Sequence, residues 1–271
     1  MTAVLGAPAL PAQVANPMKF VRETWLVFQR QMLIVKRTPI RLVIGIAQPV
    51  AYLLLFAPLL KPALATVGAR TTADAYRIYV PGLLVILVLL SALFAGFGLL
   101  AELRAGIIER ARVTPVSRFA LLLGRALSEV ATLIGQALLI TVLAIPFGLT
   151  VRIVPLLVAY VMLVLMGLLA ASLSYGIALL VKNPAALGPL INTVAQPVAL
   201  LSGVLLPLTL APGWLRAVAN WNPFYWATNG TRALFGGHLG DASVWKGLLL
   251  LLVLTVPAMW WSARLFSRRV R

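Results

Sequence analysis

Charged side chains gather in one stretch of this otherwise apolar chain, residues 102–129, whose sequence is ELRAGIIERARVTPVSRFALLLGRALSE. Its first half can continue a helix from the apolar run before it, because Leu103 and Ile107 fall on one helical stripe. Pro115 would end that helix, and Ser117 is placed to cap a second one. The stretch therefore predicts a helical elbow of mixed, mainly basic charge.

The chemistry open to this elbow is electrostatic. Charges at fixed positions set the register of a docked protein, and a helix continuous with the neighbouring apolar run could pass a displacement into it. The alternative is a solvated loop whose bases only set membrane topology. Composition alone favours the solvated loop.

Catalytic and metal chemistry have few residues to work with. None of the six acidic residues lies within an apolar run, so a proton carrier at membrane depth is missing unless Glu129 is drawn inward. The chain has no cysteine and one histidine, which leaves no complete zinc site of the usual type and no thiol nucleophile. His238 and Asp241 are the only candidate metal or acid–base pair, and a solvated loop is the favoured interpretation of both.

Nucleotide hydrolysis also lacks its usual motif. No Gly-Lys dipeptide occurs, so the phosphate-binding loop G-x-x-x-x-G-K-[ST] is absent. We therefore expect a non-catalytic chain without a cofactor of its own. The net charge of +17 could suggest nucleic acid, but the bases flank apolar runs and form no long basic tract, so no nucleic-acid partner is expected.

Composition places the chain in a membrane. It is 62% hydrophobic and 11% charged, whereas soluble proteins have about 45–50% apolar and about 25% charged residues. A membrane-spanning helix needs roughly 20 apolar residues. Six runs without charge meet this need and predict an all-α integral membrane protein with six transmembrane helices: residues 42–60, 78–101, 130–151, 153–181, 185–210 and 247–263.

The distribution of basic residues predicts how these spans are oriented. With the amino terminus inside, 16 of the 23 lysines and arginines lie on the cytoplasmic side and 7 lie outside. The positive-inside rule therefore places both termini and the elbow in the cytoplasm. We expect a multi-pass protein of the plasma membrane, or inner membrane in a bacterium.

The amino-terminal region precedes the first span. Residues 1–15 are expected to form a disordered tail, and residues 16–271 a single transmembrane domain. Residues 16–41 predict an amphipathic helix in the membrane interface, with Val21 and Trp25 on an apolar stripe and with bases able to contact lipid headgroups. A helix that only leads into the first span and a moving gate are compatible interpretations.

Residues 203–246, between the fifth and sixth spans, differ from an ordinary loop. Apolar residues persist there, whereas Gly203, Pro207 and Pro212 interrupt any long helix. Trp221 is typical of an interfacial aromatic belt. We favour a re-entrant outer segment over a surface loop.

Four amide side chains lie inside the predicted spans: Gln48, Gln136, Asn192 and Gln196. Amides in lipid need hydrogen-bond partners, and they more often join helices than contact cargo. Asn192 and Gln196 are one turn apart on one face. Helix packing is therefore slightly favoured, and a substrate path is the alternative.

The elbow also matches a sequence pattern of a known family, E-R-x-x-G-T-x-E-R-L-x-V-T-P-V-S-R. Its matching residues are Glu102, Gly106, Glu109, Arg110, Val113, Thr114, Pro115, Val116, Ser117 and Arg118. Residues 201–215 give a second match with L-S-G-V, L-P and P-G-W-L, and Asn222, Pro223 and Arg232 follow. Tyr79-Val80-Pro81-Gly82 gives a weaker third match. On these residues the chain resembles the type-2 ATP-binding-cassette (ABC) exporter permeases, and within them the DrrB-like daunorubicin and antibiotic-resistance permeases.

The resemblance implies a function and partners. Such a permease pairs with a second copy or a paralogue in the membrane, and a separate ABC ATPase subunit binds the ATP and magnesium. The cargo would be an amphipathic drug, a lipid-like molecule or a cell-envelope component, exported as in drug efflux. The implied ATPase-coupling residues are Glu102, Arg104, Gly106, Glu109, Arg110, Thr114, Pro115, Ser117 and Arg118. Leu103, Arg104 and Ile107 depart from the usual family residues.

Two other functions are compatible with the composition. One is an ATP-independent channel or facilitator. The other is a membrane-embedded, lipid-modifying enzyme, for which His238 and Asp241 are the candidates.

Overall fold

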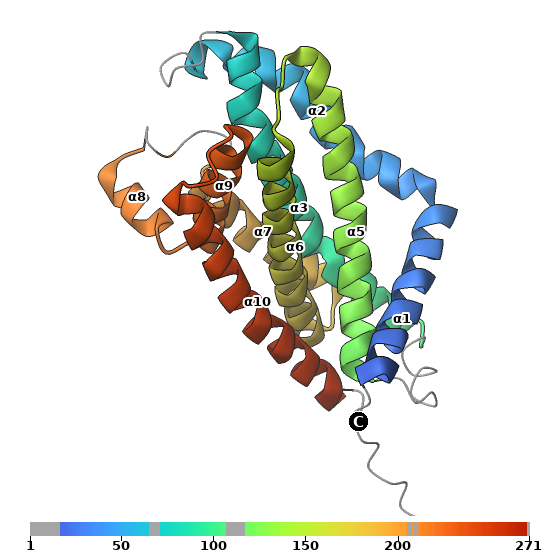
Figure 1. The fold of residues 1–271 in the computed structure, drawn as a ribbon. Helices are drawn as coiled ribbons and strands as arrows, with labels where there is room; N and C mark the ends of the chain where they lie inside the picture. The colour runs from blue at the N-terminus through green and yellow to red at the C-terminus, as the bar shows by residue number, and fades with distance from the viewer. Residues whose placement is uncertain (1–16, 65–70, 107–116, 205–207, 209–210, 270–271) are drawn as a thin grey trace, which may run out of the picture.

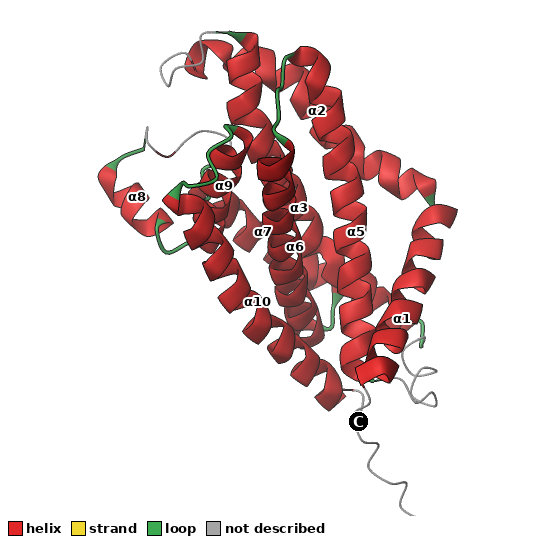
Figure 2. Ribbon diagram, viewed as in Figure 1, coloured by secondary structure: helices red, strands yellow, loops and turns green. Residues whose placement is uncertain are grey.

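The computed structural model describes residues 17–64, 71–106, 117–204, 208 and 211–269. All regular secondary structure within these residues is helical, as predicted (Figure 2). The elements are α1 (Pro17–Arg37), α2 (Pro39–Leu64), α3 (Thr72–Arg104), α5 (Arg118–Ala144), the 3₁₀ helix η2 (Ile145–Phe147), α6 (Ile153–Val181), α7 (Pro184–Leu201), α8 (Gly213–Ala219), α9 (Pro223–Phe235) and α10 (Ala242–Arg269).

Five helices in the described residues are long and apolar enough to cross a membrane, which supports a multi-pass membrane protein. They cover Tyr76–Arg104, Arg118–Phe147, Ile153–Val181, Pro184–Leu201 and Ala242–Arg268. These five correspond to the second through sixth predicted spans. The first predicted span falls in α2, where the described residues include a shorter apolar helical stretch, Gly45–Leu55. A count of six therefore remains a prediction.

Local backbone geometry explains where two helices end earlier than predicted. The helix expected to run through Ile107 stops at Arg104, because Gly106 adopts a left-handed backbone with φ of 66°. The fifth predicted span, residues 185–210, stops at Leu201, where Gly203 has φ of 68°. Glycine adopts this conformation without a steric penalty and so ends helices readily.

The start of α5 agrees with the sequence. Ser117 has an extended backbone, and its hydroxyl oxygen accepts a hydrogen bond from the Ala120 N–H. The helix therefore begins at Arg118, well before the apolar run at 130–151. The charged residues of the elbow's second half thus belong to the same rigid helix as the membrane span.

Helices α3 and α6 form the centre of the bundle, and both contribute many fully buried side chains. Helix α2 packs on α3, α10 packs on α6 and α9, and α1 packs along α5 (Figure 1). Small residues permit the close contacts. The Ser174 hydroxyl of α6 accepts a 2.9 Å hydrogen bond from the Gly96 N–H of α3, and a side chain at Gly176 would collide with Trp261.

Two short helices, α8 and α9, occupy much of residues 203–246. Arg232 of α9 donates from Nη2 to the Val204 carbonyl at 2.8 Å and from Nε to the Ile78 carbonyl at 3.4 Å. A Cβ at Gly82 would lie 2.2 Å from the same Val204 oxygen, so glycine permits this close approach. Helix α9 packs against α3, α6 and α10, and α8 contacts α7. Its re-entry into the membrane remains a prediction.

Candidate functional site

The candidate site lies where α1 meets the two described flanks of the elbow, the end of α3 and the start of α5. In Figure 1 the first turns of α1, the first turns of α5 and the last turns of α10 gather at one end of the bundle, near the carboxyl terminus. The Arg118 guanidinium donates to the Ser267 carbonyl at 2.5 Å, which joins α5 to the end of α10. Arg104 donates to the Lys182 carbonyl at 3.4 Å, at the end of α6.

Helix α1 packs against α5 with polar side chains and points much of its apolar surface outward. Glu23 and Thr24 are buried, whereas Val21 and Trp25 are exposed. Two residues of the expected apolar stripe, Val21 and Trp25, are thus exposed, and the placement of α1 in the membrane interface remains a prediction. Glu23 and Thr24, which lie between Arg22 and Arg30 in the sequence, are instead buried against the start of α5.

Close backbone packing brings α1 against α5. Gly124 of α5 leaves room for this contact, because a Cβ there would lie 2.6 Å from the Thr24 carbonyl oxygen and 2.8 Å from Cβ of Val27. The rings of Phe20 and Phe119 stack at 5.7 Å between centroids. The two helices are therefore in direct contact next to the elbow.

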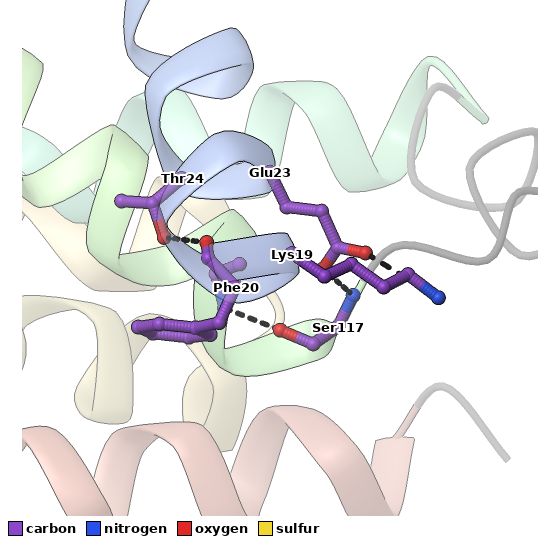
Figure 3. Close-up of polar contacts among 6 residues, drawn as sticks. Lys19, Phe20, Glu23, Thr24 and Ser117 are labelled. Atoms are coloured by element: carbon purple, nitrogen blue, oxygen red, sulfur yellow. Dashed lines mark hydrogen bonds and ion pairs between the residues drawn. The ribbon is translucent and has the colours of Figure 1, made fainter. Parts of the chain in front are cut away.

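Glu23 bonds directly to the residue that caps α5 (Figure 3). Its carboxylate accepts a 2.8 Å hydrogen bond from the Ser117 N–H. The Lys19 ammonium lies 3.9 Å from the other Glu23 oxygen. In a capping box the third residue of the helix supplies this carboxylate, but here that residue is Ala120. Helix α1 thus completes the cap of α5 from outside.

The other flank carries a buried ion pair. Arg125 Nη1 of α5 lies 2.6 Å from Glu102 Oε2 of α3, with side-chain exposures of 7% and 19%. The Gln31 amide of α1 donates to the second Glu102 oxygen at 2.9 Å. The Arg125 guanidinium also lies 5.9 Å from the ring centroid of Tyr175. Gly98 of α3 leaves room for the Arg125 guanidinium, because a Cβ at this position would lie 2.3 Å from Arg125 Nη2.

The structure places five of the nine predicted coupling residues at this end of the bundle: Glu102, Arg104, Gly106, Ser117 and Arg118. The other four, Glu109, Arg110, Thr114 and Pro115, lie outside the described residues. Glu102 is held by Gln31 and Arg125 and is mostly buried, so its described contacts are within the chain.

The four amides predicted for helix packing or a substrate path do not form one group. Gln136 is buried, and a Cβ at Gly45 of α2 would lie 2.8 Å from its Nε2, so Gln136 lies at a helix contact. The Gln48 amide is exposed and donates to the Tyr52 hydroxyl at 3.2 Å. Asn192 and Gln196 share an exposed face of α7.

Asp241 has a local structural partner. Its carboxylate accepts hydrogen bonds from the Ser243 hydroxyl at 2.6 Å and the Ser243 N–H at 2.8 Å, at the start of α10. These bonds lower the pKa of Asp241, and the nearby His238 lowers it further. Among the described residues no three histidine, cysteine, aspartate or glutamate side chains come together as metal ligands would.

Sequence reasoning missed Glu23 and Gln31 as members of this site. Both lie in the predicted amphipathic helix, for which only the basic residues were given a partner, the lipid headgroups. One signal could have found Glu23, because it is the only acidic residue among the first 73 residues and stands in a basic helix. Gln31 lies two turns later on the same face and has no comparable signal.

Three comparisons bear on the family of the chain. The model of the ABC-2 type transporter family matches residues 22–235, which include both flanks of the elbow and α9. The daunorubicin resistance ABC transporter permease protein DrrB1 of Streptomyces coeruleorubidus is 25% identical over 250 residues, covering 91% of this chain and 84% of that protein. A protein from Porphyra purpurea named as a transport permease, ycf38, is 28% identical over 255 residues, covering 88% of this chain and 86% of that protein.

Proposed function

The chain belongs to the ABC-2 type transporter family, and from this premise we propose that it is the transmembrane permease subunit of an ATP-driven exporter. A membrane permease role follows from the family and from the five candidate spans. Energy would come from a separate ABC ATPase, because the sequence contains no Gly-Lys dipeptide and hence no phosphate-binding loop.

One observation carries the coupling role of residues 102–129. The described flanks of this elbow are the end of α3 and the start of α5, and both helices are membrane-span candidates. A force applied to either described flank would therefore act on a helix that is itself a membrane-span candidate. Bonds from Arg104 to the end of α6 and from Arg118 to the end of α10 extend the same connection to two further spans.

The proposed orientation puts this end of the bundle in the cytoplasm. Most of the lysines and arginines belong to α1, the elbow and the end of α10. The positive-inside rule favours a cytoplasmic location for such a cluster. An ATPase in the cytoplasm would then have direct access to the elbow.

A second permease copy or a paralogue would complete the transport path. Only one stripe of α7 is buried, formed by Leu187, Ile191, Ala195 and Ala199. The exposed side carries Asn192 and Gln196, and amides facing lipid tails lack hydrogen-bond partners. We place this face against the second subunit or along the path between the two.

The cargo class rests on similarity. One relative is named for daunorubicin resistance, and we propose an amphipathic drug or a lipid-like or cell-envelope molecule as cargo for this chain. Export would start from the cytoplasm or the inner leaflet. Lipids would surround the spans and contact the exposed apolar side of α1.

Reconstitution tests this function. The tagged chain would be purified from its native membrane, its copurifying proteins identified, and transport of daunorubicin measured in proteoliposomes with ATP. We expect an ABC ATPase to copurify, and we expect transport to require its hydrolysis. Full transport in vesicles that contain only this chain would instead support an ATP-independent facilitator.

A further inference from the structure

We propose that Glu23 and Gln31 are positioning residues for energy coupling, because they fasten α1 to both described flanks of the elbow. Through them α1, the end of α3 and the start of α5 move together as one body. The proposal rests on the proposed function as an exporter subunit. It assigns α1 a mechanical role beyond that of a membrane anchor.

The first fastening is the bond between Glu23 and Ser117 (Figure 3). The Glu23 side chain is buried, and it is directed at the amino terminus of α5, where unpaired N–H groups carry partial positive charge. A carboxylate stabilises this end of a helix. Because the carboxylate belongs to α1, moving α1 away would leave the Ser117 N–H without this acceptor.

The second fastening is the bond between Gln31 and Glu102. Gln31 follows Glu23 by eight residues, which is about 12 Å along a helix. Glu102 in turn pairs with Arg125, so this bond joins α1 to α3 and α5 at once. A single contact would let α1 pivot, whereas two contacts separated along the helix also fix its direction.

The exposed side of α1, which faces away from α5, indicates why α1 would be fastened to the elbow. Met18, Val21, Trp25 and Leu26 are exposed there, and a surface pocket of about 490 Å³ is lined by Met18, Val21, Arg22 and Trp25. An apolar side with bases beside it is typical of a helix that lies in a membrane interface. Helix α1 would thus hold the elbow at a fixed depth, while its polar side holds the elbow in register.

The first experiment measures ATP hydrolysis by the purified complex in proteoliposomes. We expect Glu23→Ala and Gln31→Ala each to lower daunorubicin-stimulated ATP hydrolysis at least fivefold, while the ATPase still copurifies. Glu23→Gln keeps a hydrogen-bond acceptor and should retain most of the stimulation. Gln29→Ala is the matched control, because Gln29 is exposed on the same helix, and it should behave as wild type.

The outcomes separate this proposal from the proposed function. If the wild-type chain binds no ATPase, the proposed function fails. If the wild-type complex is stimulated and both alanine variants equal it, the positioning role is overturned. A loss in Glu23→Gln as large as in Glu23→Ala, with Gln29→Ala normal, would contradict the assignment of the Glu23–Ser117 hydrogen bond as the fastening.

A cross-link provides a second measurement that does not depend on the alanine variants. The chain has no native cysteine, so Phe20→Cys and Phe119→Cys can be joined by a short thiol-specific reagent across the α1–α5 contact. If α1 and α5 move as one body, the cross-linked complex keeps its stimulated hydrolysis. Loss of hydrolysis on cross-linking, recovered when a cleavable reagent is reduced, would show that α1 must leave α5 and would overturn the proposal.

Discussion

Glu23 and Ser117 are 94 residues apart in sequence, and the carboxylate of one accepts a 2.8 Å hydrogen bond from the backbone N–H of the other. Capping of a helix is ordinarily a local event, settled within four residues. Here it depends on a side chain of α1, a helix that precedes α2 and α3 in the chain. The start of α5 is therefore sensitive to the position of α1.

The α1–α5 contact predicts the effect of adding one methyl group. Gly124→Ala places a Cβ about 2.6 Å from the Thr24 carbonyl, so one of the helices must shift. Such overpacking costs roughly 1–3 kcal/mol. We expect a lower thermal unfolding temperature in detergent and weaker stimulation of ATP hydrolysis.

A matched control lies on the same helix. No atom lies within 4 Å of a Cβ built at Gly135, so Gly135→Ala should leave stability unchanged or raise it slightly. Equal unfolding temperatures for the Gly124→Ala and Gly135→Ala variants would contradict the close contact between α1 and α5.

The buried ion pair predicts a strong dependence on both partners. Arg125→Gln leaves the mostly buried Glu102 carboxylate without its cation, and loss of one partner of a buried pair costs about 3–5 kcal/mol. The double variant Glu102→Gln with Arg125→Gln removes both charges and should regain part of that stability. Arg104→Gln is the control, because Arg104 is exposed and should cost less than about 1 kcal/mol. Thermal unfolding of the wild type, Glu102→Gln, Arg125→Gln and the double variant measures the coupling between the two residues, which additive costs would refute.

The sequence predicted the spans better than it predicted the contacts between them. The charge-free run at 153–181 coincides with α6, and the cap at Ser117 was confirmed, because both follow from local composition and spacing. The end of α3 was predicted too late, since the helical stripe through Ile107 gave no weight to the left-handed backbone that Gly106 adopts.

The orientation of α1 could not be obtained from periodicity. An amphipathic pattern shows which residues share a face, and it does not show whether the polar face meets water or protein. Glu23 lies on a polar face that meets protein, and its partner is a backbone group far along the chain. The ion pair between Glu102 and Arg125 was missed for a similar reason, because both residues had been counted as parts of a solvated or docking surface.

The contact of α9 with α3 predicts a stabilising role for Arg232. Its guanidinium joins the carbonyls of Val204 and Ile78, which belong to segments far apart in the sequence. Arg232→Lys keeps the charge but offers a single donor group, so we expect a loss of about 1–3 kcal/mol. Thermal unfolding checks this. Copurification of the ATPase should be unchanged, because α9 is not part of the elbow.

The exposed amides of α7 predict a defect in transport without a defect in folding. Asn192→Leu and Gln196→Leu remove polar groups that no buried contact requires, so stability in detergent should be maintained. If this face borders the path, daunorubicin transport in proteoliposomes should fall severalfold. Thr193→Val is the control, because the Thr193 hydroxyl is already bonded to the Pro189 carbonyl within the helix. Normal transport by both leucine variants would exclude this face from the path.

The absence of native cysteine allows the orientation to be measured directly. Single cysteines would be introduced at Ala105, beside the elbow, and at Gly240, before α10; both positions are exposed, and nothing lies within 4 Å of a Cβ at Gly240. A membrane-impermeant maleimide should label Gly240→Cys in intact cells and Ala105→Cys only after the membrane is opened. Labelling of Ala105→Cys in intact cells would place the elbow on the extracellular side of the membrane, opposite the cytoplasmic ATP. A cytoplasmic ATPase could not reach the elbow in that orientation, so the same result would count against the proposed coupling mechanism.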